Sequence, residues 1–120
     1  MLTELTKRFR FEAAHRLPRA PEGHKCRRLH GHSYHVEVAI RGEVDDDAGW
    51  LCDFADIAAA VEPVRATLDH DYLNDIEGLD NPTSENLARW LWRRLAPALP
   101  GLCAIVIEET CTSRCVYRGE

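Results

Sequence analysis

Apolar and polar residues alternate near the start of the chain. One side of this pattern, from residue 9 onward, consists of Phe9, Phe11, Ala13 and His15. The intervening residues 8, 10 and 12 are charged. Successive side chains of a β-strand point to opposite faces, so a period of two residues predicts a strand with one buried face. His15 would lie on that apolar face.

A second alternating segment begins at residue 30. One side of it consists of His30, His32, Tyr34, Val36, Val38 and Ile40. Residues 17–29, between the two segments, include two prolines and a glycine and show no regular period, which is typical of a loop. This loop is too short and too rich in proline for a crossover helix, so we predict that the two strands form an antiparallel pair.

Two later segments have the spacing of amphipathic helices. The first would be capped by Asp53, and its apolar residues recur at intervals of three or four at Phe54, Ile57, Val61, Val64 and Leu68. The second begins near Thr83 and ends before Pro97, and its apolar residues are Leu87, Trp90, Leu91 and Leu95. The apolar stretches 102–107 and 115–117 then predict two more strands.

This order of elements, ββααββ, predicts a single α+β domain over residues 1–120. An antiparallel sheet would carry both helices packed on one face, because that arrangement buries the apolar side of every element. Four strands leave two unpaired edges. We therefore expect the protein to form homo-oligomers through edge pairing.

The net charge of the chain limits the kinds of molecule that it could bind. A formal net charge of −5 and a pI near 5.7 argue against nucleic acid or an anionic membrane, since both require a basic surface. No apolar run is long enough for a membrane span, and the first residues lack a signal-peptide pattern. Five irregularly spaced cysteines indicate reduced thiols rather than a disulfide framework. We expect a cytoplasmic protein.

Three histidines fall on the apolar side of the predicted strand pair. His30 and His32 are two residues apart, so their rings point the same way, and His15 on the neighbouring strand can supply a third nitrogen. Three imidazoles match a catalytic zinc site, which keeps its fourth position open, whereas structural sites usually have four ligands. The alternative is that these histidines only pack or face solvent, as single strand histidines usually do.

Two further clusters of residues contain candidate catalytic side chains. Cys26 is flanked by cations at positions 25, 27 and 28, which favour the thiolate form of the side chain. His70 lies between Asp69 and Asp71, and a neighbouring carboxylate can orient a histidine ring for proton transfer. His70 is equally well explained as an ordinary histidine at a helix end.

Five segments occur in order along the chain: FEAAH, CRRLHGHSY, LDHDYLN, NPTSENLARWLW and EETCTSRCVYRGE. Together they resemble the 6-pyruvoyl-tetrahydropterin synthase family, and the resemblance extends from Phe9 to Glu120. Its most diagnostic element is Cys26, followed after three residues by the sequence HGH. In the 6-pyruvoyl branch of the family the cysteine usually lies farther from the HGH. The spacing here therefore favours the 6-carboxy branch.

The resemblance implies a fold, an assembly and a reaction. Members of the family have the tunnelling fold (T-fold) and assemble as homohexamers, dimers of trimers, with active sites between subunits. The implied substrate is 7,8-dihydroneopterin triphosphate, and the product is 6-carboxy-5,6,7,8-tetrahydropterin, formed with release of acetaldehyde and triphosphate. This zinc-dependent carbon–carbon lyase reaction belongs to queuosine biosynthesis.

The resemblance also assigns roles to residues. It implies that His15, His30 and His32 bind zinc, that Cys26 accepts a proton, and that Asp69 and His70 form a proton relay. It implies that Glu109, rather than the adjacent Glu108, anchors the pterin, with Thr110 following in the same pattern. It places Thr83 and Ser84 near the pterin ring, although hydroxyls at a helix start more often cap the backbone.

The triphosphate of the implied substrate requires cations. The candidates are Arg16, Lys25, Arg27 and Arg28, each of which could equally be a solvated loop residue. Two other functions stay open. One is elimination of triphosphate by a 6-pyruvoyl-type synthase, and the other is a non-catalytic protein that binds zinc or a pterin.

Overall fold

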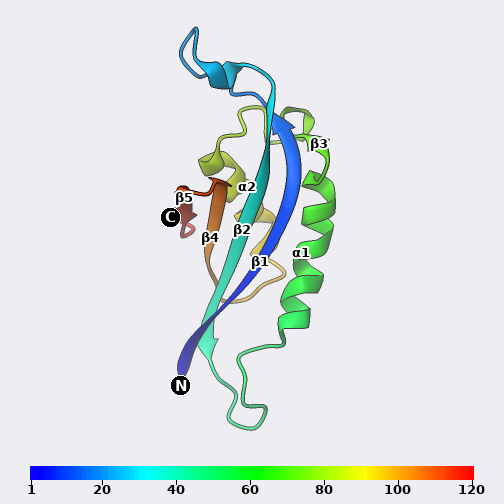
Figure 1. Ribbon diagram of the computed structural model, residues 1–120. Helices are drawn as coiled ribbons and strands as arrows, with labels where there is room; N and C mark the ends of the chain where they lie inside the picture. Colours follow the sequence, from blue (N-terminus) through cyan, green and yellow to red (C-terminus); the bar gives the residue numbers. More distant parts are fainter.

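The computed structural model describes residues 1–120, and its framework is a long antiparallel strand pair (Figure 1). Strand β1 (Leu2–His15) pairs with β2 (His30–Glu43) along its whole length, from Leu2 opposite Glu43 to His15 opposite His30. The predicted pair is therefore confirmed. β1 begins at Leu2, ahead of the predicted start at Arg8.

The sheet has five strands in the order β3-β1-β2-β4-β5. Strand β4 (Leu102–Thr110) pairs antiparallel with β2, and β5 (Ser113–Tyr117) pairs antiparallel with β4. The sequence predicted shorter versions of both strands and missed β3 (Asp71–Tyr72), which runs parallel to β1. A strand of two residues has no period, so nothing in the pattern could reveal it. The sheet is therefore mixed rather than purely antiparallel.

Both predicted helices are present. Helix α1 (Phe54–Leu68) is capped by Asp53, whose side chain accepts a hydrogen bond from the Ala55 N–H. Helix α2 (Ser84–Leu95) is capped by Thr83, whose hydroxyl accepts from the Asn86 N–H at 3.1 Å. Neither helix is long and apolar enough to cross a membrane.

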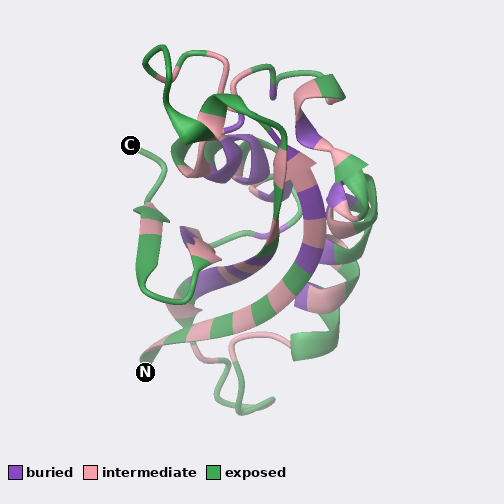
Figure 2. Cartoon of the chain, turned by 45° about the horizontal axis from the view of Figure 1, so that its top comes forward, coloured by how far each residue is buried: buried purple, intermediate pink, exposed green.

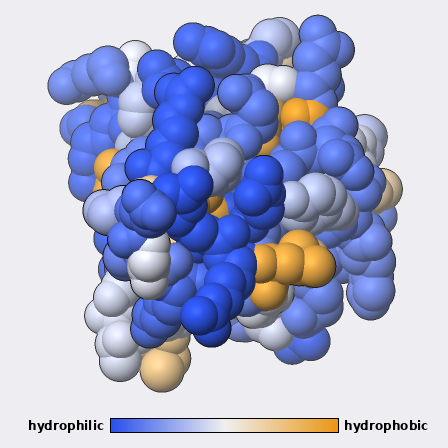
Figure 3. Space-filling model, turned by 90° about the horizontal axis from the view of Figure 1, so that it is seen from above, coloured by the Kyte–Doolittle hydropathy of each residue, from blue (hydrophilic) through white to orange (hydrophobic).

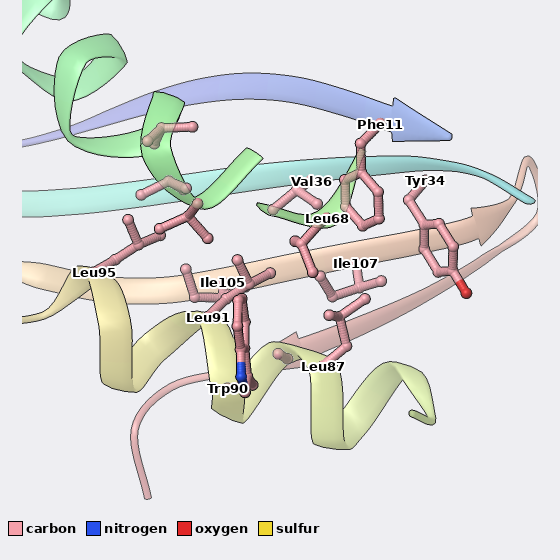
Figure 4. Close-up of a cluster of buried hydrophobic side chains, with 14 of the residues drawn as sticks. Phe11, Tyr34, Val36, Leu68, Leu87, Trp90, Leu91, Leu95, Ile105 and Ile107 are labelled. Atoms are coloured by element: carbon pink, nitrogen blue, oxygen red, sulfur yellow. The ribbon is translucent and has the colours of Figure 1, made fainter. Parts of the chain in front are cut away.

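The core lies between the two helices and one face of the sheet (Figures 1 and 4). Its largest fully buried side chains include Phe11 and Tyr34 from the strand pair and Leu91 from α2. Burial alternates along β1 and β2, as Figure 2 shows for the strand ribbons. The predicted arrangement, with both helices on one face, is confirmed.

The other face of the sheet is polar. Here Glu108 of β4 forms ion pairs with Arg8 at 3.7 Å and with Arg114 at 3.2 Å. The outer edge of β1 has a strand partner only at Ala13 and Ala14, so most of this edge is unpaired, and β5 forms the opposite edge of the sheet. The molecule is elongated, with extents of 57 × 23 × 23 Å.

Candidate metal centre and active site

The end of the strand pair brings three histidine rings together on the core face of the sheet. His15 Nε2 lies 3.0 Å from His30 Nε2 and 3.1 Å from His32 Nε2. The strand register explains this geometry, because His15 is opposite His30 and Ala13 is opposite His32. His15 is fully buried, whereas His30 and His32 are partly exposed.

Hydrogen bonds at the far side of two rings determine which nitrogens face the centre. His15 Nδ1–H donates to the Pro82 carbonyl at 2.9 Å, and His30 Nδ1–H donates to the Arg28 carbonyl at 2.7 Å. Neutral rings that donate from Nδ1 present an unprotonated Nε2. Two such lone pairs at 3.0 Å repel each other unless a cation lies between them, so the donor set fits a metal ion.

Burial also favours the neutral form of two of the rings, those of His15 and His32. Desolvation lowers the pKa of both His15 and His32, and the nearby Glu109 carboxylate opposes this effect only in part. A neutral imidazole is the form that binds a metal. The rings are arranged for one metal with three nitrogen ligands, which leaves a fourth position open.

Glu109 lies next to the histidines on the same face. Its Oε1 accepts a hydrogen bond of 2.6 Å from the Ser84 hydroxyl, and its Oε2 is 3.7 Å from His32 Nε2. The adjacent Glu108 points to the polar face of the sheet, where it pairs with arginines. Glu109 also lines a hollow of about 510 Å³ with Ser84, Thr110 and Cys115. The two neighbouring glutamates thus serve opposite faces of the sheet.

Of the two hydroxyl residues at the start of α2, only Ser84 faces this hollow. The Thr83 hydroxyl is used as the helix cap, the default role for such a residue. Thr110 is the last residue of β4 and lines the hollow from the opposite side.

Asp69 and His70 form a pair between the end of α1 and the start of β3. Asp69 Oδ2 is 3.0 Å from His70 Nδ1, and Asp69 Oδ1 accepts from the Glu12 N–H at 2.9 Å. This backbone bond, followed by the contact with His70, lowers the pKa of Asp69. His70 has a left-handed backbone (φ 57°), and its N–H donates to the Glu12 carbonyl at 2.6 Å. Strained backbone of this kind is often found at functional sites.

The side chain of His70 points away from the core. It is 77 % exposed and lines a hollow of about 560 Å³ with Glu12, Ser33, Tyr72 and the predicted metal ligand His32. No hydrogen bond or ion pair joins Asp69 or His70 to the three histidines. Within one chain the predicted relay is therefore not bonded to the predicted metal ligands, although His70 and His32 line the same hollow.

Cys26 lies in the loop between β1 and β2, in a short 3-10 helix, η1 (Lys25–Arg27), at the top of Figure 1. The Cys26 N–H donates to His24 Nδ1 at 3.0 Å, and its carbonyl accepts from the Leu17 N–H at 2.8 Å. Lys25 is exposed, and Arg27 makes only one long contact, 3.5 Å, with the Ala20 carbonyl. The surface at this end of the molecule is mainly hydrophilic (Figure 3). No hydrogen bond joins Cys26 to His15, His30 or His32.

The sequence interpretation missed two residues that contact His15. The Pro82 carbonyl receives the Nδ1 proton, and the buried Tyr34 hydroxyl lies 3.1 Å from the same nitrogen. Burial raises the pKa of Tyr34, so its hydroxyl stays protonated. The alternation of β2 placed Tyr34 on the correct face, but no sequence signal marks a backbone carbonyl as a histidine partner.

The fold and the site together define an α+β protein with a three-histidine centre at one end of its sheet. A family model described as 6-pyruvoyl tetrahydropterin synthase matches residues 4–120. The chain therefore belongs to the 6-pyruvoyl tetrahydropterin synthase family.

Three relatives illustrate the range of this family. The chain is 45 % identical to a 6-carboxy-5,6,7,8-tetrahydropterin synthase of Synechocystis, over 92 % of this chain and 89 % of the relative. It is 38 % identical to a dihydroneopterin monophosphate aldolase of Pyrococcus furiosus, over 84 % of this chain and 82 % of the relative. The solved 6-pyruvoyl tetrahydropterin synthase of Caenorhabditis elegans superposes with a TM-score of 0.92 at 30 % identity, covering 100 % of this chain and 97 % of that chain.

Proposed function

We propose that this protein is a zinc-dependent 6-carboxy-5,6,7,8-tetrahydropterin synthase of queuosine biosynthesis. It would convert 7,8-dihydroneopterin triphosphate to 6-carboxy-5,6,7,8-tetrahydropterin, acetaldehyde and triphosphate. One observation carries the proposal: three imidazole nitrogens converge beside the Glu109 carboxylate, in a chain 45 % identical to the Synechocystis synthase.

His15, His30 and His32 are the residues that would hold the zinc ion. When bound there, zinc would supply a Lewis acid for the oxygens of the substrate side chain. The carbonyls of Pro82 and Arg28 orient His15 and His30 for this task, because each accepts the proton on the far nitrogen of a ring.

Glu109 is the proposed pterin anchor. A carboxylate at the edge of the hollow can accept two N–H bonds from the amino-pyrimidine edge of a pterin ring. Ser84 holds Oε1 of this carboxylate, which fixes the plane of the group before the ring arrives. Thr110 lines the same hollow, and Thr83 maintains the start of α2.

Cys26 is the proposed proton acceptor. Its neighbours Lys25 and Arg27 are candidates to bind the triphosphate. The contact between the Cys26 N–H and His24 gives the thiol a defined backbone position within its loop.

Asp69 and His70 are proposed to act on a site of a neighbouring subunit. No hydrogen bond or ion pair joins this pair to the histidine centre of its own chain, and the His70 side chain is 77 % exposed. The long unpaired edge of β1 and the free edge of β5 favour assembly of several copies, for which we propose a dimer of trimers. Such an assembly would bring the relay of one chain to the metal centre of another.

The decisive experiment is a product assay. The purified protein is incubated with zinc and 7,8-dihydroneopterin triphosphate, and acetaldehyde and triphosphate are measured together. Equal amounts of both products support the proposal, whereas triphosphate without acetaldehyde indicates a 6-pyruvoyl-type reaction. Faster turnover of dihydroneopterin monophosphate would instead indicate the activity for which the Pyrococcus relative is named.

A further inference from the structure

Asn74 links three segments around His15 with its side-chain amide. Its Oδ1 accepts a hydrogen bond from the Arg16 N–H at 3.0 Å, and its Nδ2 donates to the Arg16 carbonyl at 2.9 Å. The same Nδ2 reaches the Asp80 carbonyl at 3.4 Å. Arg16 directly follows His15 in the chain, and Asp80 lies two residues before Pro82, whose carbonyl accepts from His15.

The amide replaces a strand partner that the sheet does not provide. β3 pairs with β1 only at Ala13 and Ala14, after which the chain turns away in the short 3-10 helix η2 (Leu73–Asp75). The N–H and carbonyl of Arg16 therefore have no backbone partner on that side, and Asn74 satisfies both groups. Leu73 is fully buried, so η2 is a firm base for this contact.

We propose that Asn74 is a positioning residue for the three-histidine centre, an inference that rests on the metal site of the proposed function. Asn74 fixes the backbone that follows His15 and also contacts the segment that supplies the Pro82 carbonyl. Without the amide, both restraints on the His15 ring would loosen together. Nε2 of His15 would then no longer be held at 3.0 Å and 3.1 Å from the other two nitrogens.

The test measures metal affinity rather than activity. Zinc affinity is determined by chelator competition, and the visible spectrum of the cobalt-substituted protein reports the coordination geometry. Asn74→Ala is expected to weaken zinc binding about 10- to 100-fold, the usual effect of losing a partner that orients a ligand, and to change the cobalt spectrum. Asn74→Asp keeps the acceptor for the Arg16 N–H but loses both donated bonds and sets a carboxylate oxygen against two carbonyl oxygens, so it should weaken zinc binding as well.

Asp45→Ala is the matched control. The Asp45 side chain also accepts two backbone bonds, at 2.8 Å from Asp47 N–H and 3.0 Å from Ala48 N–H. It lies beyond the end of β2 that is farthest from His30, so its loss should leave zinc affinity unchanged.

The possible outcomes test the role of Asn74 separately from the metal site itself. Wild-type affinity in Asn74→Ala, or equal losses in Asn74→Ala and Asp45→Ala, would overturn the role of Asn74 while the metal site stands. A wild-type protein that binds no zinc would refute the proposed function and this inference with it. If Asn74→Ala does not fold, Asn74→Asp decides the question by the same comparison with Asp45→Ala.

Discussion

The Ser84 hydroxyl donates a hydrogen bond of 2.6 Å to the Glu109 carboxylate. This contact joins the first residue of α2 to the end of β4, two elements that also pack together in the core. It fixes one oxygen of Glu109 and leaves the other, Oε2, near His32. The carboxylate proposed to bind the pterin is thus aligned by a helix rather than by a mobile loop.

Replacing Ser84 with alanine should therefore weaken substrate binding. A hydrogen bond to a charged group contributes about 1.5–3 kcal/mol, so we expect KM to rise roughly tenfold or more with a smaller change in kcat. Steady-state kinetics on the pterin triphosphate measures both constants. Ser84→Thr keeps the hydroxyl and is the control that should restore KM. An unchanged KM in Ser84→Ala would argue against alignment of Glu109 by this residue.

Replacing His32 with alanine should remove zinc and activity together. A site with two remaining ligands should lose more affinity than the 10- to 100-fold typical of an outer partner, so we expect zinc occupancy near zero after dialysis. His35→Ala is the matched control, because His35 lies on the same strand but on the opposite face. Elemental analysis gives the occupancies, and full zinc content in His32→Ala would refute its assignment as a ligand.

Cys26→Ala should abolish turnover while zinc stays bound. Loss of a positioned base commonly reduces kcat about 10²- to 10⁴-fold, and no hydrogen bond joins Cys26 to His15, His30 or His32. Cys111→Ala, at an exposed position beyond β4, is the control and should keep full activity. Normal turnover in Cys26→Ala would favour the non-catalytic function that the sequence left open.

The charge of Asp69 should contribute to stability in a pH-dependent way. Hydrogen bonding from the Glu12 N–H, followed by the contact with His70, lowers the pKa of Asp69 in the folded protein. A lowered folded pKa gives stability that is present above the unfolded pKa of about 3.9 and is lost as pH falls through the folded value. Asp69→Asn should therefore be less stable than wild type at pH 7. The difference in the free energy of unfolding between the two proteins should become smaller below about pH 4.

Urea unfolding of Asp69→Asn and wild type between pH 7 and the acid limit of folding tests this expectation. Asp71→Asn is the comparison, because Asp71 is exposed and its carboxylate bonds only to the adjacent Tyr72 N–H. If the difference in unfolding free energy between Asp69→Asn and wild type stays constant with pH, the charge of Asp69 does not contribute to stability.

The alternation of strands β1 and β2 is the part of the sequence that predicts a shared face for the three histidines. The period of two residues places His15, His30 and His32 on one face, and the structure adds the register that brings them together at one end of the strand pair. The same period of two accounts for the opposite faces of Glu108 and Glu109 on β4.

The parts of the candidate site that the sequence did not predict depend on long-range contacts, which leave no local pattern in the sequence. The Pro82 carbonyl and the Asn74 amide reach the His15 region only because loops far along the chain fold back onto the end of β1. The face on which His70 lies is set by β3, a two-residue strand whose pairing with β1 is decided by tertiary contacts. These long-range contacts explain why the sequence did not predict where the Asp69–His70 pair lies.

The fourteen-residue pairing of β1 with β2 also has a consequence for folding fidelity. A slip of one residue would turn the imidazole of His15 toward solvent relative to those of His30 and His32, because every side chain of a slipped strand changes face. A pair slipped by one residue could not chelate an ion with all three rings. A metal that binds the three histidines would therefore stabilise the native register of β1 and β2 over pairings slipped by one residue, by mass action.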